Sequence, residues 1–531
     1  MIALLVVSVL LPALAGLTCT VRAPRGAHGP GRLGAAATGV ACAGAAVLCA
    51  AVAWMGPVAA VVTSRHGTAA FGLVADRLTA PLLLMVCGVS AVVQRFASRY
   101  LSGDPKQARL IAAAGLTTSA VAAVVTAATL GVLVMAWLLS GIGLLVLLGQ
   151  RSDLPAARVG VRRAAAAFLV GDAALVLAAV LVWSRVGELD LRSVGTGARA
   201  LAGDQLHLFG VGLGTLVACL LVIAAMARSA QLPLQRWLPA TLAAPTPVSA
   251  LLHAGLVNAG GILLVRLAPV FGLSLVATTL AFLVGSATAL YGTVLMLVKP
   301  DLKGALAHST MAQMGYMLLA CSLGAFAAAV FHLVAHGMYK ASLFLGADSA
   351  VHRAKWRATL PRPAAPRGPG WLRLTAAGLC PGVALALALA TFASAALDHP
   401  GAIVLLAFAW VTAAQAGARW LAAAPAWPGL GLAAIAAGCL GYAGLLAGTN
   451  RLLEPVLGVA GHPVAAWLTV LPAGGFAAIY AASRRPGSRP WRLLYSWALD
   501  AGHVRAARLR TAPATLVAPA PAPARVPSVT G

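Results

Sequence analysis

Apolar segments long enough to cross a lipid bilayer recur along the whole chain and constrain its fold more than any other feature. Such segments become helices, because the bilayer offers backbone groups no other hydrogen-bond partners. The 531 residues are 61% hydrophobic and only 9% charged. We therefore predict an all-α, polytopic membrane protein with about 13–15 transmembrane helices. The predicted spans are 1–20, 36–62, 78–94, 109–128, 129–149, 163–185, 206–227, 244–265, 270–297, 305–323, 325–347, 371–397, 401–424, 427–449 and 462–482.

Arginine and lysine gather in short connections that are separated by even numbers of predicted spans. Cytoplasmic connections carry an excess of these residues, so all of the basic connections can face the cytoplasm together. This predicts a multi-pass protein of the cell (plasma or inner) membrane, with its N-terminus outside and its C-terminus in the cytoplasm. It also explains the net charge of +26 without a nucleic-acid partner. The basic connections lie within 22–32, 95–109, 151–163, 353–373 and 484–492.

Changes in composition divide the chain into six predicted regions. Proline, arginine and glycine concentrate between 361 and 369, which is typical of a linker. The last residues are a low-complexity sequence that cannot bury enough apolar surface to fold. The regions are N-terminal transmembrane helices (1–108), a core (109–350), a cytoplasmic linker (351–370), C-terminal transmembrane helices (371–482), a charged and aromatic segment for interfacial or docking contacts (483–510) and a disordered tail (511–531).

A proline-rich stretch interrupts the apolar pattern between 228 and 261. Proline removes a backbone donor and clashes with the preceding turn, so a helix that enters this stretch must break. Broken helices at membrane depth are the usual setting of an ion or substrate path in a transporter. The prolines are Pro233, Pro239, Pro245 and Pro247.

Three ionisable residues belong to this predicted site. Asp172 is a carboxylate inside an otherwise apolar span, and it needs a cationic partner at membrane depth. Arg228, at the start of the proline-rich stretch, is the predicted partner. His253 follows the prolines, and it either satisfies a neighbouring backbone carbonyl or relays protons.

A second polar pattern is formed by His332, His336 and Lys340, which are spaced four residues apart. On a helix this spacing places the three side chains on one face, about one turn from each other. Histidine titrates near neutral pH, and burial brings lysine toward that range, so the stripe predicts a proton or cation path. The competing interpretation is that these groups only hold packed helices together. Three titratable groups in register favour the path.

The chain has no motif for covalent or redox chemistry. It lacks a Walker loop, a dinucleotide fingerprint and a haem-attachment motif, so we predict no cofactor and no catalytic residue. Eight cysteines are scattered singly, without CxxC spacing. His332 and His336 have no third ligand near them in sequence, so no metal site is predicted.

The proline-rich stretch and the polar stripe resemble the antiporter-like membrane subunits of respiratory complex I and of multi-subunit sodium/proton antiporters. The resemblance extends over about residues 70–350. It implies two inverted five-helix repeats, each with a broken helix, and a polar axis through the centre of the membrane. By the same resemblance, Lys303 and His308 join the proton or cation path. The segments that carry it are 228–238, 245–254, 301–317 and the stripe of His332, His336 and Lys340.

Several positions depart from the respiratory pattern. In those subunits a lysine is usual at the position of Arg228, and a glutamate follows the tryptophan that corresponds to Trp137, where this chain has Leu138. Arginine does not release its proton in proteins, so Arg228 holds a charge rather than relaying a proton. The region 372–397 also lacks the lysine expected in the last broken helix of a respiratory subunit.

Three further runs are similar to DabB, the membrane subunit of two-component inorganic-carbon accumulation complexes. The resemblance implies a membrane subunit that is not itself an enzyme. It would couple protons or sodium ions to one-way hydration of carbon dioxide to bicarbonate in DabA, a zinc-containing, carbonic-anhydrase-like partner. The alternative is a proton-translocating subunit of a complex I-like oxidoreductase or an Mrp-type antiporter. The three runs are 253–261, 94–105 and 491–502.

Overall fold

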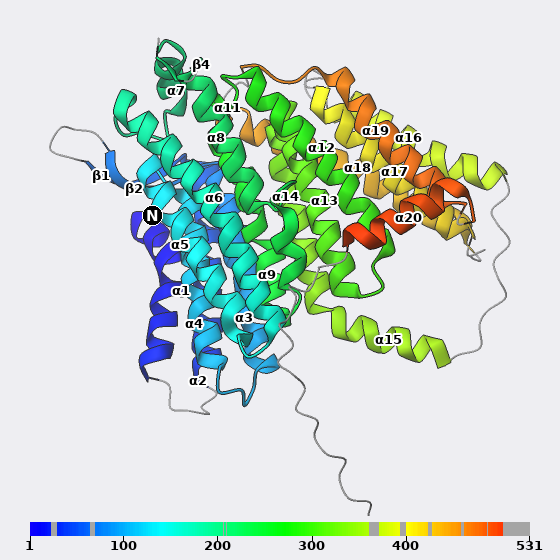
Figure 1. Cartoon of the computed structure of the whole chain (residues 1–531), viewed down its shortest axis with the longest axis horizontal. Helices are drawn as coiled ribbons and strands as arrows, with labels where there is room; N and C mark the ends of the chain where they lie inside the picture. Colours follow the sequence, from blue (N-terminus) through cyan, green and yellow to red (C-terminus); the bar gives the residue numbers. More distant parts are fainter. Residues whose placement is uncertain are drawn as a thin grey trace, which may run out of the picture.

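The computed structural model describes residues 1–22, 29–63, 69–204, 206–208, 210–359, 371–392, 400–422, 427–457, 461–485 and 487–502, and these are mainly helical (Figure 1). The first half of the chain contains α1 (Ile2–Arg22), α2 (Gly29–Met55), β1 (Val58–Thr63), β2 (Ala69–Ala75), α3 (Thr79–Tyr100), α4 (Gln107–Thr126), α5 (Leu130–Leu148), α6 (Pro155–Val186), α7 (Val194–Ala202), β3 (His207–Leu208), β4 (Val211–Gly212), α8 (Leu213–Arg228), α9 (Thr246–Ala254) and α10 (Ala259–Arg266). The second half contains α11 (Ala268–Phe271), α12 (Leu275–Val298), α13 (Leu302–Ser322), α14 (Phe326–Leu345), α15 (Ala347–Thr359), α16 (Trp371–Phe392), α17 (Pro400–Ala422), α18 (Pro428–Leu453), α19 (Val470–Ser483) and α20 (Arg489–Gly502).

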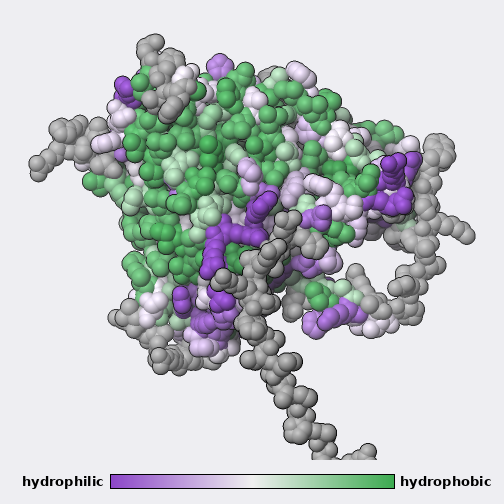
Figure 2. Space-filling view, in the orientation of Figure 1, coloured by the Kyte–Doolittle hydropathy of each residue, from purple (hydrophilic) through white to green (hydrophobic). Residues whose placement is uncertain are grey.

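The polytopic all-α fold expected from the sequence is confirmed. Each of the predicted apolar segments contains a helix or a helix pair, and parts of 36–62 and 206–227 form strands. Within the described ranges, 11 helical segments are long and apolar enough to cross a membrane, and Leu213–Arg228 and Thr375–Thr391 are shorter apolar helices. Figure 2 shows apolar side chains over most of one face, with hydrophilic residues gathered toward its lower part.

The helices form one continuous arrangement. In Figure 1 the N-terminal helices lie at one side, the C-terminal helices α16 to α19 lie at the other, and α12 to α14 lie between them. The central helices pack closely through small residues: a Cβ on Gly315 of α13 would lie 2.6 Å from the Gly285 carbonyl oxygen of α12. The C-terminal helices pack on Tyr316 and Phe331 of α13 and α14 through a separate apolar cluster.

Two β-hairpins depart from the helical prediction. The predicted span 36–62 ends as a helix at Met55, and Val58–Thr63 pairs antiparallel with Ala69–Ala75. Gly56 has a positive φ of 90° and is followed by a proline, so the helix stops there. The β-branched residues that follow suit a strand. A second, two-residue pairing joins β3 and β4.

Two proline-containing regions of the second half contain helices. The predicted linker 351–370 begins as part of α15, which ends at Thr359; its alanine, lysine and arginine residues are good helix formers. The rest of that linker, and the predicted tail 511–531, lie outside the described residues. The region 372–397, which lacks the lysine of the respiratory pattern, contains most of α16, and this helix continues past Pro381. Neighbouring helices and small backbone adjustments make proline tolerable in membrane helices.

The predicted segment 483–510 contains α20, an amphipathic helix that packs against the end of α12. Ala498 of α20 is fully buried there, and the Trp497 ring contacts Tyr291 edge-on at 5.9 Å. Lys299 Nζ donates a hydrogen bond of 2.7 Å to the Gly502 carbonyl, which belongs to the last turn of α20. Residues beyond Gly502 lie outside the described part of the chain.

Arg266 stabilises the end of α4, and its removal should be costly. The guanidinium is buried and donates to the carbonyls of Val125 and Ala127. Each buried carbonyl left without a donor costs roughly 1–3 kcal/mol, so we expect Arg266→Met to lower the free energy of unfolding by about 3 kcal/mol. Melting of the purified protein in detergent would measure this. Arg199→Met, at an exposed position of α7, is the control; equal melting temperatures for the two variants would contradict the assignment.

Candidate functional site

The first site lies where α8 ends. The helix stops at Arg228, Ala230 adopts a positive φ of 52°, and a short 3-10 helix continues over Gln235–Thr241. Pro233 lies in the irregular segment between them, and Pro239 lies within the 3-10 helix. The broken helix expected from the proline-rich stretch is therefore present.

The remaining prolines begin the next helix rather than breaking one. Pro245 is the N-cap residue of α9, and Pro247 lies in its first turn, where a proline's missing N–H costs nothing. The following span is interrupted again at Gly255, after which a single 3-10 turn leads into α10. Most of this irregular backbone is covered by protein, whereas Pro233 and Arg236 are exposed.

The Arg228 guanidinium is held on several sides and is only 1% exposed. Its Nη1 donates to Ser140 Oγ at 3.0 Å, and its Nη2 donates to the Trp137 carbonyl at 3.3 Å. The charge also lies over the rings of Trp137 and Phe168, at 4.5 and 4.6 Å from their centroids. Aromatic faces and carbonyl oxygens favour a permanent cation, so the enclosure is suited to a fixed positive charge.

Asp172 of α6 lies against this guanidinium, as the sequence predicted that it would. Its Oδ1 accepts a 2.9 Å bond from Arg228 Nη2 and a 2.8 Å bond from Trp137 Nε1. The Asp172 side chain is 21% exposed, so its carboxylate lies at the edge of the packed interior. Leu138 occupies the position after Trp137 where the respiratory pattern has a glutamate, so that position carries no charge here. The negative charge beside Arg228 comes from Asp172 on α6.

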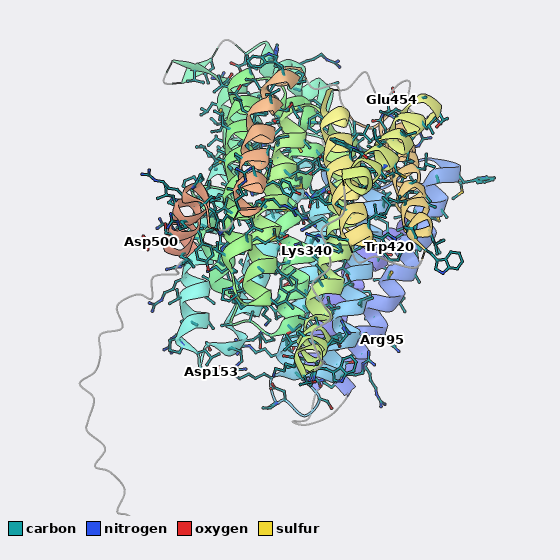
Figure 3. All side chains as sticks on the ribbon, turned by 90° about the vertical axis from the view of Figure 1, so that its right-hand side faces the viewer. Arg95, Asp153, Lys340, Trp420, Glu454 and Asp500 are labelled. Carbon is teal, nitrogen blue, oxygen red and sulfur yellow. The ribbon has the colours of Figure 1, made fainter. Side chains whose placement is uncertain are left out.

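The second site is built on α14, where His332, His336 and Lys340 share one face. The two imidazole rings are stacked, with centroids 5.9 Å apart. Lys340 Nζ donates a 2.8 Å hydrogen bond to Ser309 Oγ of α13, and its side chain is 1% exposed. In Figure 3 Lys340 lies at mid-height, between Arg95 and Asp153 at one end and Glu454 at the other.

His253 extends this stripe from the neighbouring helix. Its ring stacks on Phe344, one turn beyond Lys340, at a centroid distance of 4.4 Å. His253, His332 and Lys340 all lie close enough to His336 to interact with it electrostatically. Lys303 acts on His253 in the same way, and its Nζ donates to the Ala244 carbonyl at 3.3 Å.

The polar file therefore consists of Lys303, His253, Lys340, His336 and His332, in that order from the end of the fold where α15 lies. His253, Lys340 and His336 are buried, whereas Lys303 and His332 are partly exposed. Among the described residues, none provides a hydrogen bond to either ring nitrogen of His336, to His253 Nδ1 or to His332 Nε2. Buried polar atoms normally have partners, so these nitrogens are suited to a line of water molecules.

His308 is not brought into this file. It is buried on α13, but its Nδ1 lies 2.8 Å from the Gly304 carbonyl of its own helix. The charged groups that act on it are Lys299 and Asp301 rather than Lys340. Asp301 is the N-cap residue of α13 and accepts a hydrogen bond from Gly304 N.

Sequence reasoning missed the polar face of α13. Ser309 contacts Lys340, and Gln313 and Tyr316 lie farther along the same helix, with the Tyr316 ring edge-on to His332 at 5.1 Å. Their spacing at 309, 313 and 316 is helical, so this stripe could have been found from its period. Gln313, Tyr316 and His332 also line a pocket of about 530 Å³ between α12–α14 and the C-terminal helices.

Known proteins resemble this chain in sequence and fold. The family described as "NADH:quinone oxidoreductase/Mrp antiporter, TM" matches residues 127–362, and "NADH-Ubiquinone oxidoreductase (complex I), chain 5 N-terminus" matches residues 62–110. The Mrp complex from Dietzia sp. DQ12-45-1b contains a similar fold, with a TM-score of 0.61 at 24% identity, covering 94% of this chain and 59% of that one. A chain of respiratory complex I from Thermus thermophilus with bound NADH is also similar, with a TM-score of 0.53 at 20% identity. The similarity covers 93% of this chain and 99% of that one.

Proteins related in sequence include DabB subunits and a respiratory subunit. The chain is 38% identical over 375 residues to "Probable inorganic carbon transporter subunit DabB1" of Halothiobacillus neapolitanus, covering 68% of this chain and 67% of that protein. It is 37% identical over 280 residues to the DabB protein of Bacillus anthracis, covering 53% and 54%. It is 35% identical over 285 residues to NADH-quinone oxidoreductase subunit L of Mycobacterium tuberculosis, covering 53% and 44%.

The polytopic helical fold and the two matching family models place the chain in the class of antiporter-like membrane subunits. This chain belongs to that family and is DabB-like within it, which confirms the resemblance inferred from its sequence. The matched region spans 54% of the length of the Bacillus anthracis relative and 44% of the length of subunit L.

Proposed function

We propose that this chain is the cation-coupling membrane subunit of a two-component inorganic-carbon uptake complex, with protons as the coupling ion. In this proposal it energises a zinc-containing, DabA-like partner that hydrates carbon dioxide to bicarbonate on the cytoplasmic side. The observation that carries the proposal is the polar file of Lys303, His253, Lys340, His336 and His332 in a DabB-like chain.

The chemistry of the file supports proton transfer. Imidazole both donates and accepts, and an amine in an apolar interior exchanges its proton more readily than one in water. Lys340 belongs to none of the ion pairs formed by the described residues, so its charge is not fixed by a carboxylate. His332, His336 and Lys340 lie about one helical turn apart on α14, a spacing that water molecules can bridge.

The first site supports a DabB-like role over a respiratory or Mrp-type one. Arg228 keeps its proton, and Leu138 cannot ionise, so the lysine and glutamate of the respiratory pattern are both replaced. The Arg228–Asp172 pair then acts as a fixed electrostatic neighbour of the titratable file. A chain that worked as a respiratory or antiporter subunit would be expected to titrate at both sites.

Co-expression tests the proposal. We expect this chain and a DabA-like protein together, but neither alone, to restore growth of a carbonic-anhydrase-deficient bacterium at ambient carbon dioxide. The physical reason is that bicarbonate supply requires both the gradient and the hydration chemistry. Growth rate and uptake of labelled inorganic carbon are the measurements. Copurification with quinone-reducing or antiporter subunits, without rescue, would favour the alternative function.

A further inference from the structure

The helix α15 stands apart from the rest of the molecule. In Figure 1 it lies at the lower edge, beneath the bundle, and Val351 to Trp356 are exposed along its length. Val351 is 42% exposed and Trp356 is 63% exposed. A free helix of this length is only marginally stable in water, because packing supplies most helical stability in proteins. Its surface therefore suits a contact with another molecule.

The two faces of α15 differ, and the difference indicates that a protein rather than a membrane binds this helix. Ala347, Ala350, Val351 and Ala354 recur at helical spacing and make a shallow apolar face. Helices that lie in a membrane interface place tryptophan, phenylalanine or leucine on the apolar face. Here Trp356 lies three residues after Arg353 and on the opposite, polar face.

Trp356 and Arg353 are the residue types that dominate protein–protein contacts. His352, Arg353 and Lys355 are exposed beside the tryptophan, so the charge of this polar face complements an acidic surface. The amphipathic helix α20 shows the contrast, because its Ala498 and Trp497 already pack on α12 of the same chain.

The helix α15 follows α14 directly in the chain, and α14 carries part of the polar file. Only Gly346 separates it from α14, and backbone hydrogen bonds continue through that residue: Gly346 N donates to Ser342 O at 2.9 Å, and Ala350 N donates to Gly346 O at 3.0 Å. Lys340 lies six residues before Gly346 on α14. A partner bound to α15 would thus be attached directly to the helix that carries three of the titratable groups.

We propose that the polar face of α15, formed by His352, Arg353, Lys355 and Trp356, docks an acidic surface of the soluble partner subunit. This inference rests on the proposed function, and it names the place where the two components meet. The face lies on the side of the fold that the positive-inside rule assigns to the cytoplasm. Its basic groups predict that higher ionic strength weakens the contact.

Retention of the partner by the solubilised complex tests this docking surface. We expect the double variant Arg353→Glu/Trp356→Ala to reduce the amount of DabA-like protein that copurifies with the tagged chain by at least about tenfold, because tryptophan and arginine anchors carry much of the binding energy of an interface. The matched control is Arg199→Glu/Trp54→Ala, at exposed positions of α7 and α2, which should retain the partner. Equal melting temperatures of the purified chains would show that both variants are folded.

A photo-crosslinking amino acid at position 356 provides a second measurement. We expect it to form an adduct with the DabA-like protein, whereas the same group at the exposed position 54 should not. Adducts only with lipid, or full retention of the partner by the double variant on α15, would overturn the docking proposal. If the unmodified chain itself fails to retain the DabA-like protein, the proposed function fails instead.

Discussion

Lys340→Met should abolish the growth rescue while leaving the complex with its partner assembled. Methionine fills a similar volume but carries neither a charge nor a proton, so the file would be interrupted between His253 and His336. We expect inorganic-carbon uptake to fall by about 100-fold or more, because a positioned proton-transfer group contributes 10²–10⁴-fold. The Lys340 ammonium is buried and contacts Ser309, so bulk water cannot replace it easily.

Two control variants define what the lysine does. Tyr339→Phe, at an exposed position beside it on α14, should retain full uptake. Lys340→Arg keeps the positive charge without a releasable proton, so it should behave like Lys340→Met if titration matters. A variant that combines Lys340→Met with neutral replacements of His332 and His336 tests the whole stripe. Full growth rescue by this variant would show that the three side chains only pack the helices together.

Arg228→Met should strongly destabilise the protein. The substitution leaves the Asp172 carboxylate at membrane depth without its cation, and removing one partner of such a pair costs about 3–5 kcal/mol. It also removes the hydrogen bonds to Ser140 and to the Trp137 carbonyl. We expect a large fall in the melting temperature of the purified protein, and less protein in the membrane.

The double variant Arg228→Met/Asp172→Leu should be more stable than Arg228→Met alone, because no unpaired charge remains. The pair of Arg192 and Asp190 is a matched control: its nitrogen–oxygen distance is 2.7 Å, but its side chains are 41% and 27% exposed. Exposed pairs contribute about 0–1 kcal/mol, so Arg192→Met should change the melting temperature little. Independent, additive effects of the Arg228 and Asp172 substitutions would contradict the coupling.

The transmembrane architecture was largely predictable, because bilayer thickness sets a minimum length for an apolar helix. The break after Arg228 was predictable for a similar reason, since proline has the same local effect in any fold. The strand at Val58–Thr63 was not, because a short apolar run suits both a helix end and a strand. Val58–Thr63 is a strand because it pairs with Ala69–Ala75, which the local sequence does not reveal.

The candidate site was predictable only in part. His332, His336 and Lys340 share a face because helical periodicity places them there, and Asp172 needed a cation wherever it lay. Their other neighbours depend on which helices meet. Ser309 approaches Lys340 from α13, and Phe344 of α14 stacks on His253 from α9. Nothing in the local sequence around any one of these residues indicates the others.

By itself, then, the sequence determined the membrane-spanning helices, the break at Arg228 and the stripe on α14, because each follows from length, proline chemistry or helical period within one segment. Only the tertiary structure decided which groups complete the file, that His308 bonds to its own helix instead of joining it, and that α15 is left exposed. Those outcomes depend on packing between segments far apart in the chain, and local patterns do not specify that packing.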